Sequence, residues 1–417
     1  MVTVEQGEPC YAFAVSAPSQ PRNATRTLLS AFDEQGKLFS QAFSILLQAI
    51  AQRAFPAASI AVTRNDQLIA LKSFGSFVYE TDSAGAPLPA SFAETGNVVS
   101  LSSGTIFDLA SLTKPVATAT MAAILYERGQ LELDAPLIGT LPEFRAASDP
   151  RRDEVTFHML LSHSSGLPAY EKLFLKARSR DELLYAALAT PLTADPGTRA
   201  EYSDIGFILL GLALERLSGE SLDVFCQREI FGPLGMSNTT FNPPEGIRSR
   251  IPPTADERVE ASSRQDGLVR STFRNRIIQG EVQDENASVL GGVAGHAGLF
   301  STAHDLATFA FTMLQGGNPI FRPETVALFT RRESAAADTS RALGWDTPST
   351  PSQSGNYFGR NSYGHLGYTG TSLWIDPDRQ LSITLLTNRT WPDCSNQAIK
   401  QVRPKFHDAI VEALVPK

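Results

Sequence analysis

Two strand-turn-strand patterns, one near each end of the chain, constrain the fold more than any other feature of the sequence. The first is ASIAVTRNDQLIALKSFG, with Asn65-Asp66 at its turn, and the second is GTSLWIDPDRQLSITLLTNR, with Asp376-Pro377-Asp378 at its turn. In each, two runs of β-favouring residues flank residues that favour a turn, which is typical of a hairpin. Helical patterns lie between them. We therefore expect one sheet assembled from both ends of the chain.

Four stretches have apolar residues at helical spacing. We expect helices over about 38–55, from Ser111 to about Arg128, after the capping residue Thr302, and over about 396–414. The intervening residues 131–290 hold short helical patterns broken by Pro and Gly, and no paired strands are evident there.

With 417 residues, the chain is longer than one typical core requires. We therefore expect an α/β fold of the α+β type, in which an antiparallel sheet is flanked by helices and a helical domain is inserted. The expected boundaries are a loose N-terminal lead-in at 1–30, the sheet domain at 31–130 plus 291–417, and the all-helical domain at 131–290.

Charge and composition exclude several classes of function. The net charge is −8 and no long basic run is present, which argues against nucleic-acid binding. Cys10, Cys226 and Cys394 are far apart, so neither a disulfide framework nor zinc-ligand spacing is present. No histidine and carboxylate pattern indicates a metal site, and we expect no metal or organic cofactor. No G-x-S-x-G motif supports an α/β-hydrolase.

The location of the protein can also be predicted. No stretch approaches ~20 uninterrupted apolar residues, so we expect no membrane span. The first residues lack the basic start and apolar run of a signal peptide, so we expect a cytoplasmic protein, or a periplasmic one if the start has been trimmed.

The stretch FDLASLTKPVATAT (Phe107–Thr120) places Ser111 three residues before Lys114. On a helix these two side chains share a face, and Pro115 favours a helix that begins here. The positive end of the helix dipole and apolar neighbours both disfavour an ammonium group, so the pattern suggests a serine activated by a neutral lysine. Ser-x-x-Lys alone is weak evidence, because about one such match is expected by chance in a chain of this length.

Three separated stretches together strengthen the evidence that Ser111 is a catalytic serine. They are FDLASLTKPVATAT, PGTRAEYSDIGFILLG with Tyr202-Ser203-Asp204, and GHLGYTGTSLWIDP with His365-Leu366-Gly367. In this order they resemble the serine β-lactamase-like and penicillin-binding-protein-like superfamily, which includes class C β-lactamases, D-alanyl-D-alanine peptidases and related carboxylesterases. The resemblance covers about residues 40–410 and implies the fold expected above.

The resemblance also implies roles for individual residues. Ser111 would be the acylated nucleophile, and Lys114 and Tyr202 would share proton transfer. His365 would supply a polar group on the opposing strand. The backbone N–H groups of Ser111 and Tyr368 would form the oxyanion hole. The residues expected to contact substrate are Asp204, Gly367, Thr369 and His296.

Two positions depart from the family pattern. Asp204 stands where the second motif commonly has Asn, and an ionised carboxylate could hold Lys114 charged. Leu366 stands where the third motif commonly has Thr, so a hydroxyl that helps relatives bind a substrate carboxylate is missing. The residues nearby that could compensate are Thr369, Thr371, Ser372 and Arg389. Outside the motifs, we expect His163 to order a loop, and Trp345 and Trp374 to pack in the core.

These observations predict a serine hydrolase that forms an acyl-enzyme at Ser111. The leading form is carboxylesterase-like and acts on small esters or amides, including peptides. The alternatives are a β-lactamase or D-alanyl-D-alanine carboxypeptidase and, in another class, a non-catalytic penicillin-binding receptor. The sequence leaves the natural substrate and the oligomeric state open.

Overall fold

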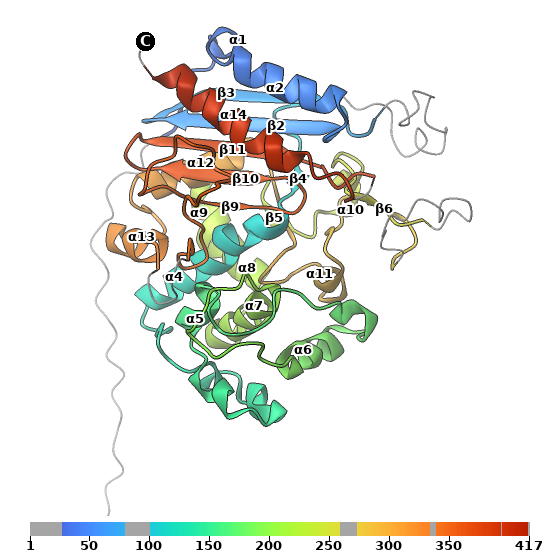
Figure 1. The fold of residues 1–417 in the computed structure, drawn as a ribbon, viewed down its shortest axis with the longest axis vertical. Coiled ribbons are helices and arrows are strands. Elements are labelled where there is room, and N and C mark those ends of the chain that lie inside the picture. The colour runs from blue at the N-terminus through green and yellow to red at the C-terminus, as the bar shows by residue number, and fades with distance from the viewer. Residues whose placement is uncertain (1–26, 80–100, 259–272, 334–338, 393, 416–417) are drawn as a thin grey trace, which may run out of the picture.

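One six-stranded sheet joins the two ends of the described chain (Figure 1). The computed structural model describes residues 27–79, 101–258, 273–333, 339–392 and 394–415. All neighbouring strands are antiparallel except β1 and β3. The order across the sheet is β1 (Leu29–Ser30), β3 (Gln67–Gly75), β2 (Ala57–Arg64), β11 (Leu381–Thr387), β10 (Ser372–Asp376) and β9 (Tyr363–Leu366). The predicted antiparallel sheet with strands from both ends is confirmed.

The two predicted hairpins meet at the centre of this sheet. β2 of the first hairpin pairs with β11 of the second from Ala58–Thr387 to Arg64–Leu381. Their turns also touch, because the N–H of Asn65 donates to the carbonyl of Gln380 at 2.7 Å. Both residues have positive φ angles, 57° and 49°, as tight turns between strands require.

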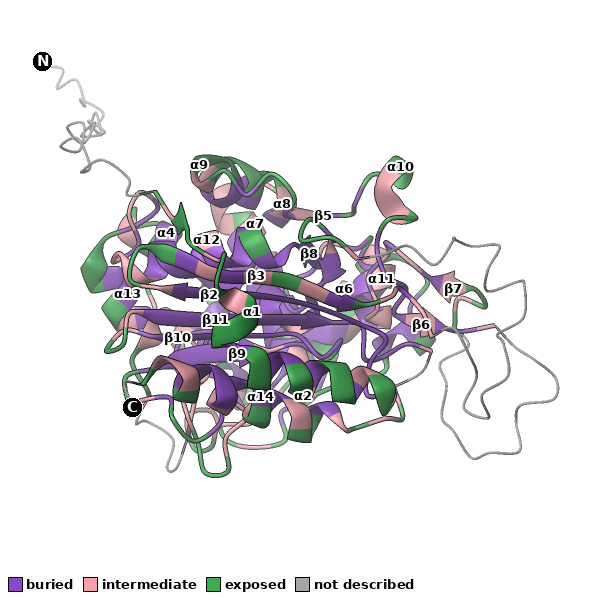
Figure 2. Ribbon diagram, turned by 90° about the horizontal axis from the view of Figure 1, so that it is seen from above, coloured by how far each residue is buried: buried purple, intermediate pink, exposed green. Residues whose placement is uncertain are grey.

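Helices cover both faces of the sheet (Figure 2). α2 (Ser40–Ala51) and α14 (Ile399–Leu414) pack together on one face, beside the short α1 (Gln35–Leu38), and α12 (Ala303–Leu314) packs on the other. Since successive strand residues point to opposite faces, Ile60 and Val62 of β2 enter the core with α2 and α14, while Ala61 enters the core with α12. The predicted flanking helices are therefore confirmed, and Thr302 caps α12 through the N–H of Asp305, as expected.

The middle of the chain forms mostly short helices next to the sheet, and most of them lie below the sheet in Figure 1. The helices from residue 120 onward are α4 (Thr120–Glu127), α5 (Phe157–Leu161), α6 (Arg180–Ala189), α7 (Asp204–Ser218), α8 (Leu222–Cys226), α9 (Gly232–Leu234), α10 (Glu245–Arg248), α11 (Glu285–Val289) and, after α12, α13 (Pro323–Thr330). Their core is continuous with the core on the α12 side of the sheet.

The expectation that residues 131–290 hold no paired strands was wrong. β5 (Thr240–Phe241) pairs with β8 (Leu299–Ser301), which also pairs with β4 (Phe107–Asp108). β6 (Ala255–Asp256) pairs with β7 (Ile277–Ile278). Strands of two or three residues are too short to show an alternating pattern. The proposed domain boundaries stay a prediction, and most of the expected lead-in lies outside the described residues.

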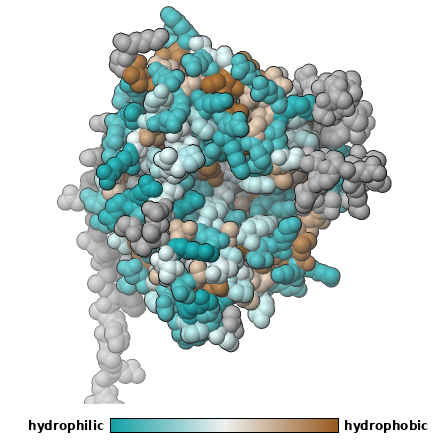
Figure 3. All heavy atoms as spheres, viewed as in Figure 1, coloured by the Kyte–Doolittle hydropathy of each residue, from teal (hydrophilic) through white to brown (hydrophobic). Residues whose placement is uncertain are grey.

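On the face seen in Figure 3, hydrophilic residues dominate and hydrophobic ones lie among them in small separate groups. Among the described residues, no helix combines the length and the apolar character that crossing a membrane requires.

Candidate active site

The first motif begins a helix, as predicted, through an unusual turn. Ser111 lies in the 3₁₀ turn Ala110–Leu112, and Ala110 before it has a φ of 48°. A left-handed residue other than glycine costs about 1–3 kcal/mol and needs support from its surroundings. Lys114 then opens the π-helical segment Lys114–Ala119, which continues into α4. Pro115 lies at the start of this segment, where its missing N–H does least harm.

Lys114 is fully buried behind Ser111. Its Nζ donates to the Ser111 Oγ at 3.1 Å, to the Asp204 Oδ1 at 2.6 Å and to the backbone carbonyl of His296 at 3.1 Å. These three bonds use all three protons of an ammonium group.

The charge state of Lys114 follows from these contacts. Burial by itself lowers the pKa of Lys114. The carboxylate of Asp204 and the nearby Tyr202 raise the pKa, and the net change is upward. The expectation of a neutral lysine beside Ser111 was therefore wrong. The reason is the departure noted in the second motif, because Asp204 supplies a negative charge where an amide would not.

The second motif is positioned by the start of α7. The Ser203 Oγ accepts the N–H of Gly206 at 2.9 Å, which places Asp204 in the first turn and Tyr202 just before it. His163 supports this arrangement, since its Nδ1 accepts the N–H of Ser203 at 3.0 Å and its ring centroid lies 4.6 Å from that of Tyr202. Burial holds the pKa of His163 well below its usual value, so this acceptor nitrogen stays unprotonated. The predicted loop-ordering role of His163 is confirmed.

Tyr202 stands between two cations. The Lys114 Nζ lies 4.7 Å from the centre of its ring, and the Arg341 guanidinium carbon lies 5.1 Å from it. The hydroxyl is buried beside Lys114 and Ser111, without a hydrogen bond of ordinary geometry to any described residue. Burial raises the pKa of Tyr202, although Lys114 opposes this change. A neutral phenol in this position can pass a proton, because its oxygen both donates and accepts.

The third motif lies at the end of β9. The Nδ1–H of His365 donates to the carbonyl of Leu366 at 2.8 Å, which leaves Nε2 as an acceptor, and this buried nitrogen has no partner among the described residues. Burial holds the pKa of His365 well below its usual value, and Lys114 and Arg341 act in the same direction. His365 is thus a neutral acceptor facing Tyr202, with the two ring centroids 5.9 Å apart.

The loop after β9 packs tightly against the turn that carries Ser111. A Cβ added to Gly367 would lie 2.4 Å from the carbonyl oxygen of Leu109 and 1.9 Å from the Thr371 Oγ1, so glycine is needed at this position. Thr369 is fully buried, and its hydroxyl donates to the backbone carbonyl of Asp108 at 2.8 Å. Thr369 therefore joins two loops and does not line the cavity, which corrects the expectation that it contacts substrate.

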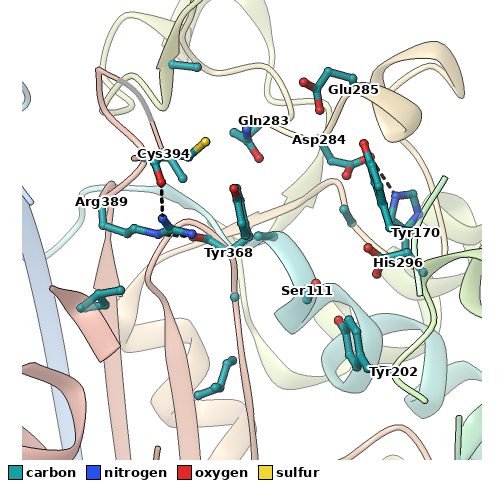
Figure 4. Close-up of a pocket in the computed structure, with 18 of the residues that line it drawn as sticks. Ser111, Tyr170, Tyr202, Gln283, Asp284, Glu285, His296, Tyr368, Arg389 and Cys394 are labelled. Carbon is teal, nitrogen blue, oxygen red and sulfur yellow. Dashed lines mark hydrogen bonds and ion pairs between the residues drawn. The ribbon is translucent and has the colours of Figure 1, made fainter. Parts of the chain in front are cut away.

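The three motifs meet at one wall of a cavity of about 920 Å³ (Figure 4). Ser111 lies between Tyr202, Tyr368 and His296 in this view. The predicted site residues that line the cavity are Ser111, Tyr202, Asp204, His296, His365, Gly367 and Tyr368. The structure thus brings together residues that are up to 257 positions apart (111 to 368) in the chain.

The cavity also contains Asp284 and Arg341, which the sequence interpretation missed, and Arg389, which it named as a substitute for the missing hydroxyl of the third motif. Asp284 accepts from the Nε2 of His296 at 2.8 Å. Burial raises the pKa of Asp284, but His296, the N–H of Ala287 and Lys114 together outweigh burial, so the pKa is lowered. The Arg389 guanidinium stacks 4.3 Å from the Tyr368 ring centre, and its Nε donates to the Tyr368 carbonyl at 2.6 Å. Arg341 lies beside Tyr202. Asp284 and Arg341 fall outside the three motifs, so the motifs could not point to them.

The described residues offer no evident metal site. In the part of the chain that the structure describes, no three His, Cys, Asp or Glu side chains gather as metal ligands would.

Comparison with known proteins now decides the family. Residues 36–402 match the family model described as Beta-lactamase. The chain belongs to the β-lactamase family. The resemblance seen in the motifs is therefore confirmed, and so is the prediction of a serine hydrolase, since the names of relatives denote hydrolytic enzymes.

Three members and neighbours of the family illustrate its range. An N-acetylmuramyl-L-alanine amidase of Bacillus subtilis is 33% identical over 80% of this chain and 77% of its own length. An Escherichia coli protein named D-alanyl-D-alanine carboxypeptidase is 32% identical over 80% of this chain and 79% of its own. The solved structure of EstCE1, a hydrolase with promiscuous acyltransferase activity, shares the fold with a TM-score of 0.67 at 21% identity, over 90% of this chain and 99% of its own.

Proposed function

We propose that this β-lactamase-family protein hydrolyses small amides and esters through an acyl-enzyme at Ser111. The observation that supports this most is the contact between Ser111 and Lys114. The hydroxyl of Ser111 faces the cavity and accepts a hydrogen bond from a buried ammonium group that Asp204 holds in place. A positive charge fixed at this distance favours the alkoxide that a serine nucleophile must become.

The proposed reaction has two steps. The Ser111 Oγ attacks the substrate carbonyl carbon, and its proton passes through Tyr202 to the leaving amine or alcohol as the C–N or C–O bond breaks. Water then attacks the acyl-enzyme, the acyl–Oγ bond breaks, the acid leaves and a proton returns to Ser111. Lys114 acts as a fixed charge throughout. We propose that the N–H groups of Ser111 and Tyr368 bind the carbonyl oxygen in both steps.

Amides deserve equal weight with esters as substrates. Two relatives that are 33% and 32% identical over 80% of this chain are named for the hydrolysis of amide bonds. The EstCE1 structure shares only the fold at 21% identity, so its ester chemistry gives weaker support.

The third motif favours substrates without a carboxylate next to the reacting carbonyl. Penicillins and D-alanyl-D-alanine peptides carry such a carboxylate, and relatives bind it from this strand. Here His365 is neutral with an acceptor nitrogen toward the cavity, and Leu366 offers no hydroxyl. Losing one charge-assisted hydrogen bond costs roughly 1.5–3 kcal/mol, or about 10–150-fold in binding.

A substrate panel tests this proposal. We expect kcat/KM for p-nitrophenyl butyrate and for N-acetylmuramyl-L-alanine amide, which both lack a carboxylate, to exceed that for a chromogenic cephalosporin, and the variant Leu366→Thr to narrow this difference by roughly 10-fold. A wild-type preference for the cephalosporin would instead make the protein a β-lactamase. A burst of acylation without turnover on every substrate would favour a penicillin-binding receptor.

A further inference from the structure

Asp108 is a buried carboxyl group that the proposed reaction does not use directly. It ends β4, three residues before Ser111, and is 2% exposed. Within the described residues no cation pairs with it, because the nearby Arg274 is bound to Glu257 at 2.6 Å. A buried carboxylate without a cation is costly unless hydrogen bonds hold it. Its place beside the nucleophile therefore needs a reason.

The two carboxylate oxygens of Asp108 join two walls of the cavity. Its Oδ1 accepts the N–H of Ala110 at 2.8 Å, and its Oδ2 accepts the N–H of Gln283 at 2.7 Å. Ala110 precedes Ser111, and Gln283 precedes Asp284, which holds His296. Asp108 thus ties the turn of the nucleophile to the opposite wall.

This tie stabilises a turn that is unfavourable by itself. Ala110 has a φ of 48°, and the hydrogen bond to Asp108 holds the residue in that conformation. Each Asp108 oxygen accepts one N–H group, so both bonds need an ionised carboxylate. A proton on either oxygen would set a donor against a donor and leave a buried N–H unpaired.

We propose that Asp108 is a positioning residue for Ser111 and acts as such only when ionised, so that hydrolysis requires the Asp108 carboxylate. This inference rests on the proposed role of Ser111 as the nucleophile. Asp108 touches neither substrate nor the reacting atoms, and it works through the backbone of Ala110.

The requirement predicts loss of activity at mildly acid pH. Burial raises the pKa of Asp108 to about 6, although the hydrogen bonds from the N–H groups of Ala110 and Gln283 oppose this rise. Two charged groups face Asp108: Asp284 adds to the rise in its pKa, and Arg274 opposes it. A raised pKa means that the carboxylate takes up its proton as the pH falls through about 6 rather than through the usual value of 3.8. We expect the rate of Ser111 acylation to fall about tenfold per pH unit below that point.

The variant Asp108→Asn tests the proposal, since its neutral amide offers one acceptor oxygen and sets an NH₂ donor against the other N–H. It mimics the protonated acid. We expect it to be at least about 10-fold slower than wild type near pH 8 and to lack the decline near pH 6. Asp305→Asn is the matched control, because Asp305 is also 2% exposed and accepts the N–H of Asn238 and the hydroxyl of Thr239, but lies outside the cavity. The control keeps the wild-type pH profile.

The measurement is the rate at which a fluorophosphonate labels the whole protein, followed by intact mass across this pH range. A decline present in wild type and Asp305→Asn but absent in Asp108→Asn supports the proposal, and a decline that persists in Asp108→Asn overturns it. Wild type that takes up no label would reject the role of Ser111, and the inference with it. If Asp108→Asn does not fold by circular dichroism, His296→Gln decides, because the imidazole of His296, bound to Asp284 at 2.8 Å, is a second titratable group in the cavity. A decline retained in His296→Gln supports Asp108, and its loss overturns the proposal.

Discussion

At the scale of single residues, the charge of Lys114 is the feature that most shapes the site. A neutral lysine would be a base for Ser111, but three hydrogen bonds and the Asp204 carboxylate hold Lys114 as an ammonium group. The proton of Ser111 must then go elsewhere. Tyr202 is the neutral phenol beside Ser111 that can relay it: Tyr202 gives its own proton to the leaving group and takes the proton of Ser111, and Lys114 stabilises the phenolate that exists between these two transfers.

This division of roles predicts that Lys114→Ala and Tyr202→Phe each lower kcat by ~10²-fold or more, since positioned proton transfer contributes ~10²–10⁴-fold. The double variant should be little slower than the slower single variant, because the charge of Lys114 acts by stabilising the phenolate that Tyr202 forms on the proton path. Steady-state kinetics on p-nitrophenyl butyrate measures the effect. Losses that multiply in the double variant would show that the residues act independently.

The sequence predicted most of the residues near the nucleophile and missed those that come from elsewhere. Ser111 and Lys114 could be paired because a helix places residues three apart on one face, and their distance of 3.1 Å agrees. The Asp284–His296 pair could not be found this way. Its partners are 12 residues apart, with the helix α11 between them, and no periodic pattern relates them.

At the scale of elements, the end of β9 fits against the turn that carries Ser111. Thr371 donates its hydroxyl to the Leu109 carbonyl at 3.0 Å, Thr369 donates to the Asp108 carbonyl, and Gly367 lies between these contacts. The distance between the third motif and the nucleophile therefore depends on the missing side chain of Gly367.

Gly367→Ala is expected to lower kcat/KM by about 10²-fold, because its Cβ would force the two loops apart by about 1 Å and misplace the oxyanion N–H groups. Gly36→Ala in α1 is the matched control, since no atom lies within 4 Å of its added Cβ. Kinetics should be compared with thermal unfolding of both variants. Wild-type kcat/KM in a folded Gly367→Ala protein would contradict this account.

The elements that the sequence predicted are the long, periodic ones. Both hairpins and the helices α2, α12 and α14 have enough residues for a pattern to repeat. The paired strands β5, β6 and β7 have two residues each, so no pattern could reveal them. The split of the Ser111 helix into 3₁₀, π and α segments likewise leaves no trace in the sequence, because all three place similar residues inward.

At the scale of the whole molecule, the site exists because distant parts of the chain fold against one another. Ser111 follows the N-terminal hairpin, Tyr202 begins a helix of the middle region, and His365 lies on a strand of the C-terminal part. Hydrophobic patterns predicted a sheet made from both ends, but they do not set distances across the molecule. The joint position of the three motifs was predictable through the family resemblance, and the contacts that fix it, such as Asp108 with Gln283, were not.

The measurement that tests the central claim most directly is intact-mass analysis after reaction with a fluorophosphonate. Wild type should gain one label, located at Ser111 by peptide mapping, and Ser111→Ala should gain none while keeping its circular dichroism spectrum. Ser44→Ala, on the exposed side of α2, is the matched control and should be labelled like wild type. A label on folded Ser111→Ala, or on another serine of wild type, would contradict the assignment of Ser111 as the nucleophile.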